Sequence, residues 1–264
     1  MRKILAIFIV LFISFDSWGQ DYRKVENLAF NNGEKLTFRI YFSSLLTGDI
    51  KAGQLTLEVN PENVKINNRN ALHIVARGWT TGIVEFFYKI DDKFESYIDQ
   101  ETVVPLRFIQ NKKENKYKKQ ETINFDRQEL FAVGNTSKKK ITGNTQDMLS
   151  DFYYARTLNV SNLNAGNYFK IPFYMDDSVY TSKIVYAGKE QIKTKLGVFN
   201  CLKFKPMVVK GKVFDESYPI TLWVTDDVNR IPILIESKLS AGEARIELTS
   251  CDGVAYPTAR NVSE

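Results

Sequence analysis

Apolar and polar residues alternate with a period of two along most of the chain, and this pattern constrains the fold more than any other feature. Successive side chains of a strand point to opposite faces of a sheet, so the alternation is typical of strands with one buried face. Gly, Asn, Asp and Pro separate the alternating segments, and no regular helical pattern lies between them. The sequence therefore predicts an all-β fold of antiparallel strands rather than βαβ units. The clearest segments are 36–43, 52–59, 71–78, 92–99, 105–112 and 168–175.

One segment departs from this pattern. In TQDMLSDFYYARTL (145–158), apolar residues recur at helical spacings, and Asp147 suits the first turn of a helix. We expect one α-helix at about 145–158, within a linker of residues 136–165. Because the segment is short and its apolar face is narrow, it is interpreted as a connector that packs on the core.

Three pairs of segments suggest an internal duplication. GEKLTFRIYF (33–42) resembles GNYFKIPFYM (166–175), and ALHIVARG (71–78) resembles VFNCLKFK (198–205). YIDQETVVPLRF (97–108) and VTDDVNRIPILI (224–235) share the same interval from Asp to Pro. We interpret these matches as two related antiparallel β-meanders, at 33–135 and 166–252, joined by the helix. The sheets are expected to be strongly curved, as in open barrels or sandwich halves, and the pattern leaves open whether they form one sheet or two barrels. An N-terminal extension (20–32) and a C-terminal tail (253–264) flank them.

The repeated Asp-to-Pro interval has a local interpretation as a hairpin connection. Asp99 and Asp226 would end a strand and cap a turn, and Pro105 and Pro232 would open the next strand, where a missing N–H does least harm. Two acids at matching places could also bind a cation, but they belong to separate turns. No metal site or cofactor is therefore expected.

The N-terminus has the organisation of a secretory signal peptide. Arg2 and Lys3 precede an apolar run at 4–15, and the small residues Ser17 and Gly19 follow it. The run is shorter than the ~20 residues of a membrane-spanning helix. We expect a signal peptide at 1–19, cleaved near Gly19, and an exported chain without a transmembrane span. No cysteine lies near this position, so lipid attachment there is not expected.

The distribution of charge bears on nucleic-acid binding, and the cysteine content bears on disulfide formation. The formal net charge is +5, and its densest cluster, NKKENKYKKQ (111–120), is better explained as a solvated hairpin tip than as a nucleic-acid site. Cys201 and Cys251 are the two cysteines of the chain. In an oxidising compartment a disulfide is possible, since the alternation places both on outward faces and permits a bridge between neighbouring strands; two free thiols are favoured.

The residues of a familiar catalytic centre are scarce. His73 is the single histidine, and the alternation places it on a strand face, where a structural role fits best. One histidine and two cysteines exclude HExxH and four-thiolate zinc sites, and no nucleotide-binding or nucleophile-elbow motif occurs. A glycan hydrolase needs only two carboxyl groups at a suitable separation, so this class stays open as an alternative. Its candidate acids are Asp91, Asp92, Glu95 and Asp227.

The most unusual composition lies in RGWTTGIVEFFYKIDD (77–92), where large apolar residues crowd a connection that should be polar. One interpretation is that they plug an end of the sheet. The other is that they form an apolar groove or lip for a lipid, a glycan or an envelope protein. The candidate ligand-binding residues are Trp79, Ile83, Phe86, Phe87 and Tyr88, with Tyr153 of the helix lining the same cavity.

Several ordered segments together resemble DUF3108, a family of exported bacterial proteins of unknown function. The resemblance covers nearly the whole chain after the signal peptide and rests on 33–59, 86–108, 146–158, 193–206 and 221–239. It implies a β protein in the periplasm or at the periplasmic face of the outer membrane of a Gram-negative bacterium. It supplies no catalytic residues to carry over.

The sequence thus favours a non-catalytic envelope protein that binds a hydrophobic or polymeric ligand, or a partner protein. An envelope glycan hydrolase and a structural scaffold are the alternatives. The residues do not identify the ligand or the oligomeric state.

Overall fold

The structure of the protein is a computed structural model that describes residues 24–44, 48–207, 219–240, 242–258 and 260–261. The signal peptide predicted at 1–19 lies outside these residues. Within them, no helix is long and apolar enough to cross a membrane.

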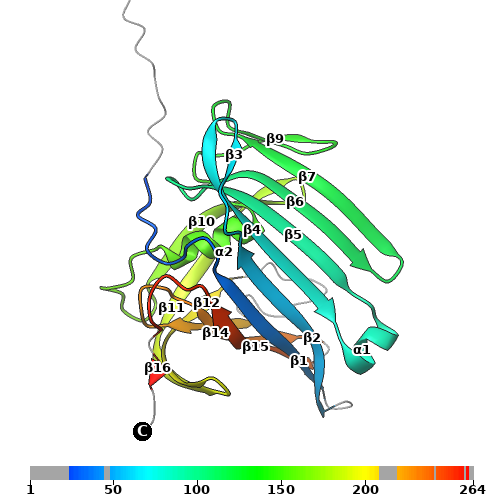
Figure 1. The fold of residues 1–264 in the computed structure, drawn as a ribbon, viewed down its shortest axis with the longest axis vertical. Coiled ribbons are helices and arrows are strands. Elements are labelled where there is room, and N and C mark those ends of the chain that lie inside the picture. Colours follow the sequence, from blue (N-terminus) through cyan, green and yellow to red (C-terminus); the bar gives the residue numbers. More distant parts are fainter. Residues whose placement is uncertain (1–23, 45–47, 208–218, 241, 259, 262–264) are drawn as a thin grey trace, which may run out of the picture.

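Antiparallel strands that follow one another along the chain build a single, strongly curved sheet (Figure 1). The first series is β1 (Lys35–Ser44), β2 (Gly48–Val59), β3 (Val64–Ile66), β4 (Arg69–Thr80), β5 (Asp91–Asp99), β6 (Pro105–Glu114), β7 (Tyr117–Asp126), β8 (Phe131–Val133) and β9 (Lys138–Lys140). The second is β10 (Tyr168–Met175), β11 (Ser178–Thr194), β12 (Gly197–Pro206), β13 (Ile220–Thr225), β14 (Pro232–Leu239), β15 (Gly242–Asp252) and β16 (Arg260–Asn261). The predicted all-β antiparallel class is confirmed.

The two series join edge to edge. β15, the last long strand of the second series, pairs with β1, and Phe38 lies opposite Leu248 at this seam. Both side chains are buried, so the core continues across the seam. The two meanders are therefore halves of one sheet rather than separate barrels.

The ends of this sheet, β9 and β10, are not joined by a strand ladder. The segment before the helix lies between them: Gln146 forms an isolated bridge with Phe173 of β10, and Ser137 lies 3.3 Å from the hydroxyl of Tyr174. Pro172 stands inside β10, where an edge strand tolerates a residue without an N–H. The sheet is thus curved like a barrel but unclosed.

The predicted connector helix is α2 (Met148–Arg156), shorter at both ends than 145–158. Asp147 caps it by accepting hydrogen bonds from the N–H groups of Leu149 and Ser150, each at 2.8 Å. The helix belongs to the central hydrophobic core, and the sheet curves around it (Figure 1). Leu149, Tyr153 and Tyr154 are buried, so the helix packs on the core.

Equivalent features recur in the two series, as expected for a duplication. Gly33 and Gly166, which precede β1 and β10, have φ of 87° and 96°. A left-handed backbone of this kind is open to glycine and strained for most other residues. The register shifts after Tyr97 in the β5–β6 pair and after Trp223 in the β13–β14 pair.

The register corrects one sequence match. Leu72 pairs with Ile98, which is followed by the turn, and Leu202 pairs with Val224 at the equivalent place. Leu72 therefore corresponds to Leu202 rather than to Phe199. Alternating strands resemble one another at several offsets, which is why the sequence match was displaced along the strand.

A second helix, α1 (Gly82–Phe87), was not predicted. It spans six residues, with no buried residue and no side-chain hydrogen bond at its N-terminus. The sequence analysis had expected one helix, because six residues are too few to show helical periodicity.

Candidate functional site

An apolar hollow with room for a ligand lies at one end of the curved sheet, beside α1. We call it the trough pocket; its volume is about 390 Å³. This volume is within the range of small-molecule sites in proteins, roughly 300–1,000 Å³. Its floor is formed by neighbouring strands β1, β2, β4 and β5, and the side chains that carry the argument are Ile40, Phe42, Leu55, Phe94, Val84 and Tyr88.

Two glycines line the hollow. Gly53 on β2 and Gly78 on β4 line the pocket on the core-facing side of the sheet, where Gly78 lies opposite Leu55. A Cβ at Gly53 would lie 2.4 Å from the carbonyl oxygen of Trp79, so this position requires glycine. A Cβ at Gly78 would meet nothing closer than an oxygen atom at 4.0 Å. Gly78 therefore leaves space that a side chain could fill.

Helix α1 forms one wall of the trough pocket. Val84 and Tyr88, four residues apart and hence on one side of the turn, line it. Ile83, Phe86 and Phe87 lie on the other side and are exposed to 59%, 83% and 73%. The short helix thus has an apolar side toward the pocket and a second apolar side toward solvent.

The structure separates the predicted ligand-binding residues into three groups. Trp79 and Tyr88 line the trough pocket, whereas Ile83, Phe86 and Phe87 project from α1. Tyr153 is fully buried, and its ring packs 4.7 Å from that of Phe30. Tyr153 is therefore a core residue and does not line the same cavity, contrary to the prediction.

Asp92 is the one carboxylate among the described residues that line the trough pocket. It is buried, and its Oδ1 accepts a hydrogen bond of 2.8 Å from the backbone N–H of Lys113. Asp91, its neighbour in β5, is bound to Arg77 at 2.9 Å, and the hydrogen bond from Arg77 lowers the pKa of Asp91. Adjacent strand residues point to opposite faces, so these two acids do not share the pocket.

The remaining candidate acids are engaged in local structure. Glu95 lies 2.8 Å from Nε2 of His73 and 2.9 Å from Nζ of Lys93. Burial opposes ionisation of Glu95, but hydrogen bonds from Lys93 and His73 lower its pKa. The ring of His73 also stacks on Tyr97 at 4.3 Å. Asp227, the fourth candidate acid, lies in a turn of the second series.

The two Asp-to-Pro turns differ in detail. Asp99 accepts hydrogen bonds from the N–H groups of Glu101 and Thr102 at 3.1 and 3.0 Å, as a turn cap does. In the second series this role falls to Asp227, which accepts from Asn229 and Arg230 at 3.0 and 3.2 Å.

Asp226, the residue predicted as the cap, instead forms an ion pair of 2.6 Å with Lys189. The second turn is one residue longer, since Ile98 pairs with Pro105 and Val224 pairs with Pro232. The equal Asp-to-Pro interval therefore concealed a shift of the cap by one residue. Pro105 and Pro232 are the first residues of β6 and β14, as predicted.

Cys201 and Cys251, both within the described part of the chain, are not joined in a disulfide. They lie on β12 and β15, which two further strands separate in the sheet. Cys201 is buried, and burial raises the pKa of its thiol to about 12. The alternation had placed both side chains on outward faces, whereas Cys201 is buried. Alternation also does not show which strands are neighbours in the sheet.

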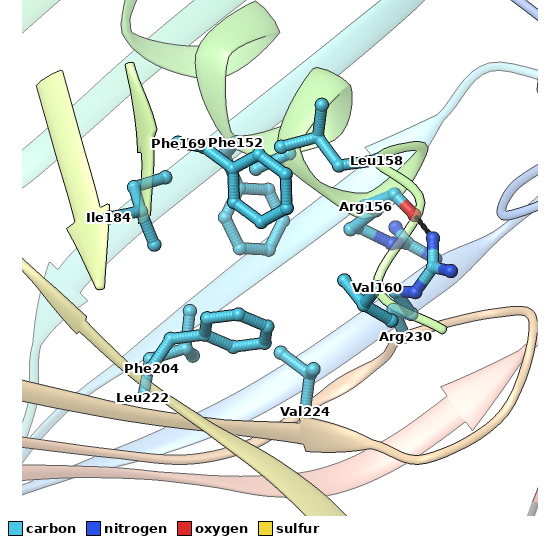
Figure 2. A pocket seen from close by; sticks show the side chains of 11 residues that line it. Phe152, Arg156, Leu158, Val160, Phe169, Ile184, Phe204, Leu222, Val224 and Arg230 are labelled. Atoms are coloured by element: carbon cyan, nitrogen blue, oxygen red, sulfur yellow. Dashed lines mark hydrogen bonds between the residues drawn. The ribbon is translucent and has the colours of Figure 1, made fainter. Parts of the chain in front are cut away.

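A second cavity, of about 40 Å³, lies between the end of α2 and the second half of the sheet (Figure 2). Phe152 and Phe169 face Phe204 and Val224 across it. Arg230 donates a hydrogen bond of 2.5 Å to the carbonyl oxygen of Arg156 at its border. A cavity of this size holds a few water molecules at most, so it is a packing defect rather than a ligand site.

Apart from Asp147, which was placed in the first turn of the helix, sequence analysis did not single out the polar groups around α2. Arg156 and Glu34 form a buried two-fold ion pair with distances of 2.6 and 2.7 Å. Burial raises the pKa of Asp147 to about 6, and burial with the nearby charge of Asp147 raises that of Asp151 to about 7. These acids occur in a helical pattern that looks amphipathic, so their sequence signal is that of exposed residues.

The described residues contain no group of three or more His, Cys, Asp or Glu side chains arranged to hold a metal ion. What the site offers is an apolar surface with one constrained carboxylate.

Comparison with known proteins gives a family and a fold. The model of a family of unknown function, DUF3108, matches residues 37–249. No curated protein sequence matches significantly. A β-barrel-like protein of a domain of unknown function, DUF1849, from Brucella abortus superposes with a TM-score of 0.58 at 9% identity, over 85% of this chain and 99% of its own. This likeness concerns the fold alone.

Two further solved structures are similar at lower scores. A candidate lipoprotein from Parabacteroides distasonis has a TM-score of 0.35 at 12% identity, over 87% of this chain and 100% of its own. A candidate exported protein from Bacteroides fragilis has a TM-score of 0.32 at 11% identity, over 86% of this chain and 99% of its own.

Proposed function

The chain belongs to the DUF3108 family of proteins of unknown function, and we propose that it binds a slender apolar ligand, such as one aliphatic chain of an envelope lipid, in the trough pocket. The protein would hold this ligand without changing it chemically. It would do so after export, as the pattern of residues 1–19 predicts.

The observation that carries the proposal is the space left by Gly78 on an otherwise apolar floor. An empty apolar hollow loses the contacts that a filled core would make, so a core without a ligand requirement would carry a larger residue there. The volume of about 390 Å³ is far above that of a packing defect. Ile40, Phe42 and Leu55 would supply the apolar contacts.

The arrangement of acids favours binding over glycan hydrolysis. Hydrolysis of a glycosidic bond requires two carboxyl groups roughly 5–10 Å apart across one cleft. Asp92 has no second carboxylate beside it among the described residues of the trough pocket.

The test is to fill the hollow. In Gly78→Leu, the new side chain occupies the pocket, and the backbone tolerates it because the φ of Gly78 is outside the left-handed region. We expect at least about tenfold weaker binding of the apolar fluorophore N-phenyl-1-naphthylamine, with displacement by dodecanoate in the unmodified protein only. The thermal midpoint should stay equal or rise, because a strand interior gains from losing a glycine.

Gly143→Leu is the matched control, since Gly143 also has open space around its Cβ and lies outside the trough pocket. It should bind the fluorophore like the unmodified protein. If Gly78→Leu also binds it unchanged, the trough pocket is not the site. In a separate measurement, native mass spectrometry of protein purified from its own envelope identifies any ligand that co-purifies with the unmodified protein and is missing from Gly78→Leu.

A further inference from the structure

We propose that the surface formed by α1 and the adjoining β6–β7 hairpin docks on an anionic lipid surface and brings the mouth of the trough pocket against it. We call this surface the tip and define it as residues 82–90 and 113–118. This docking goes beyond ligand binding and does not depend on it.

The first observation is the exposure of aromatic side chains at the tip. Phe86 and Phe87 are exposed to 83% and 73%, and Tyr117 of the hairpin to 54%. The rings of Phe86 and Phe87 touch each other edge to face, at 5.3 Å between centroids. A phenylalanine side chain stabilises a fold by leaving water. Rings that stay this exposed therefore contribute nothing to the free energy of folding. These rings therefore fit a surface that buries them only on docking.

The second observation is that the tip is held together as one body. The backbone N–H of Asn115 donates to the carbonyl oxygen of Lys89 at 2.8 Å, and the N–H of Lys89 donates to Oδ1 of Asn115 at 2.8 Å. Ile90 also forms an isolated bridge with Glu114. The short helix has no buried residue of its own, so these bonds to the hairpin fix its position. A preformed surface loses little conformational entropy when it binds.

The third observation is charge. Lys89, Lys113, Lys116 and Lys118 are all exposed. The carboxylates of the tip, Glu85 and Glu114, each form an ion pair with a lysine, at 3.4 Å to Lys89 and 3.7 Å to Lys112. Lysines thus outnumber acids around the exposed rings.

Aromatic and aliphatic side chains surrounded by lysines are the composition that binds the interface of an anionic bilayer. The rings enter the boundary between head groups and acyl chains, and the lysine stems extend so that the ammonium groups reach the phosphates. A second copy of this chain would place the same lysines against one another, which disfavours self-association through the tip.

The position of the tip gives the docking a direction. Val84 and Tyr88 line the trough pocket, while Phe86 and Phe87 of the same helix turn face solvent. A bilayer that buries these two rings would therefore lie within one helix diameter of the pocket.

The experiment measures sedimentation of the full exported chain with vesicles of phosphatidylglycerol and phosphatidylethanolamine, and with vesicles of phosphatidylcholine alone. Phe86→Ser with Phe87→Ser should weaken binding to the anionic vesicles by more than about tenfold. Lys116→Gln with Lys118→Gln should weaken it by about fivefold for each charge removed and reduce its salt dependence. The phosphatidylcholine vesicles should bind weakly to all variants.

Tyr168→Ser with Val179→Ser is the matched control, because these exposed residues lie on β10 and β11. Equal vesicle binding by the Phe86/Phe87 variant and this control would overturn the proposal. A second result would also overturn it: the unmodified protein does not bind vesicles but forms a dimer in analytical ultracentrifugation, and only the Phe86/Phe87 variant loses this dimer. Binding of N-phenyl-1-naphthylamine should persist in the Phe86/Phe87 variant, and vesicle binding should persist in Gly78→Leu, so the two proposals fail separately.

Discussion

At the scale of single residues, Asp147 and Asp151 are the unusual groups, because the fold buries the cap of α2, Asp147, and leaves Asp151 in the first turn only partly exposed. Asp147 is compensated by its capping bonds and by a 2.6 Å hydrogen bond from Ser96. Asp151 is less well compensated, since its Oδ1 has no hydrogen-bond partner among the described atoms. Its raised pKa expresses the cost of keeping that charge out of water.

The sign of the pH dependence follows from this. An ordinary aspartate has a pKa of about 4 when unfolded, whereas folding raises the pKa of Asp151 to about 7. Between these values the folded state binds more protons than the unfolded state, so the free energy of unfolding falls as pH rises from about 4 to about 7 and stays low above that range. Asp147 adds a smaller effect of the same sign, because its pKa rises to about 6.

We therefore predict that Asp151→Asn stabilises the protein at pH 8, by on the order of 2 kcal/mol, and has little effect at pH 4. Urea unfolding at both pH values measures this. Glu62→Gln, which changes an exposed acid, serves as the control. A variant less stable than the unmodified protein at pH 8 would show that the carboxylate contributes a needed interaction there.

At the scale of elements, α2 is anchored by the buried pair of Arg156 and Glu34. Arg156 also donates to the carbonyl oxygens of Ala29 and Asn229, each at 3.0 Å. One guanidinium thus connects the helix to the N-terminal segment and to a turn of the second series. Removing one partner of such a pair leaves a buried charge without compensation.

Arg156→Met is expected to lower the free energy of unfolding by about 3–5 kcal/mol. Combining it with Glu34→Leu should recover part of that loss, because no buried charge is then left alone. Guanidinium unfolding of the single and double variants gives the coupling free energy. A double variant as unstable as the sum of both singles would argue against coupling between the two residues.

Elements with a long, regular pattern were predictable, and short or irregular ones were not. The alternation identified β1, β2, β4, β5 and β6, and the helix expected at about 145–158 contains α2. Helix α1 escaped because six residues are too few to show helical periodicity. The aromatic content of 79–88 drew attention to the segment that contains one wall of the trough pocket and part of the tip. Spacing alone could not predict that Tyr88 lines the pocket while Phe87 faces solvent.

At the scale of the whole molecule, the two series share one sheet through the β1–β15 seam, and the main hydrophobic core spans both. The sequence could suggest a duplication, but it could not predict that β1 pairs with β15. These two strands lie near opposite ends of the chain. Strand neighbours far apart in sequence leave no mark in the local pattern. The same limit explains why the sequence could not show whether Cys201 and Cys251 lie on neighbouring strands.

A shared sheet predicts one cooperative unfolding transition. Trp79 lies in the first series and Trp223 in the second, so each reports on one half. Trp79→Phe and Trp223→Phe each keep only one of these two tryptophans. In each variant, the unfolding curve measured by tryptophan fluorescence should coincide with the curve measured by circular dichroism. Two separate transitions in either variant would mean that the halves unfold independently.

The unclosed edge between β9 and β10 has a consequence for how such a protein can change over evolution. In a closed barrel, strand number and stagger fix the circumference together, so the interior can be enlarged only by rebuilding the whole ladder. Here side chains and a bridging segment span the last gap. Insertions or deletions in that segment can therefore widen or narrow the interior one residue at a time, without disturbing the strands that hold the molecule together.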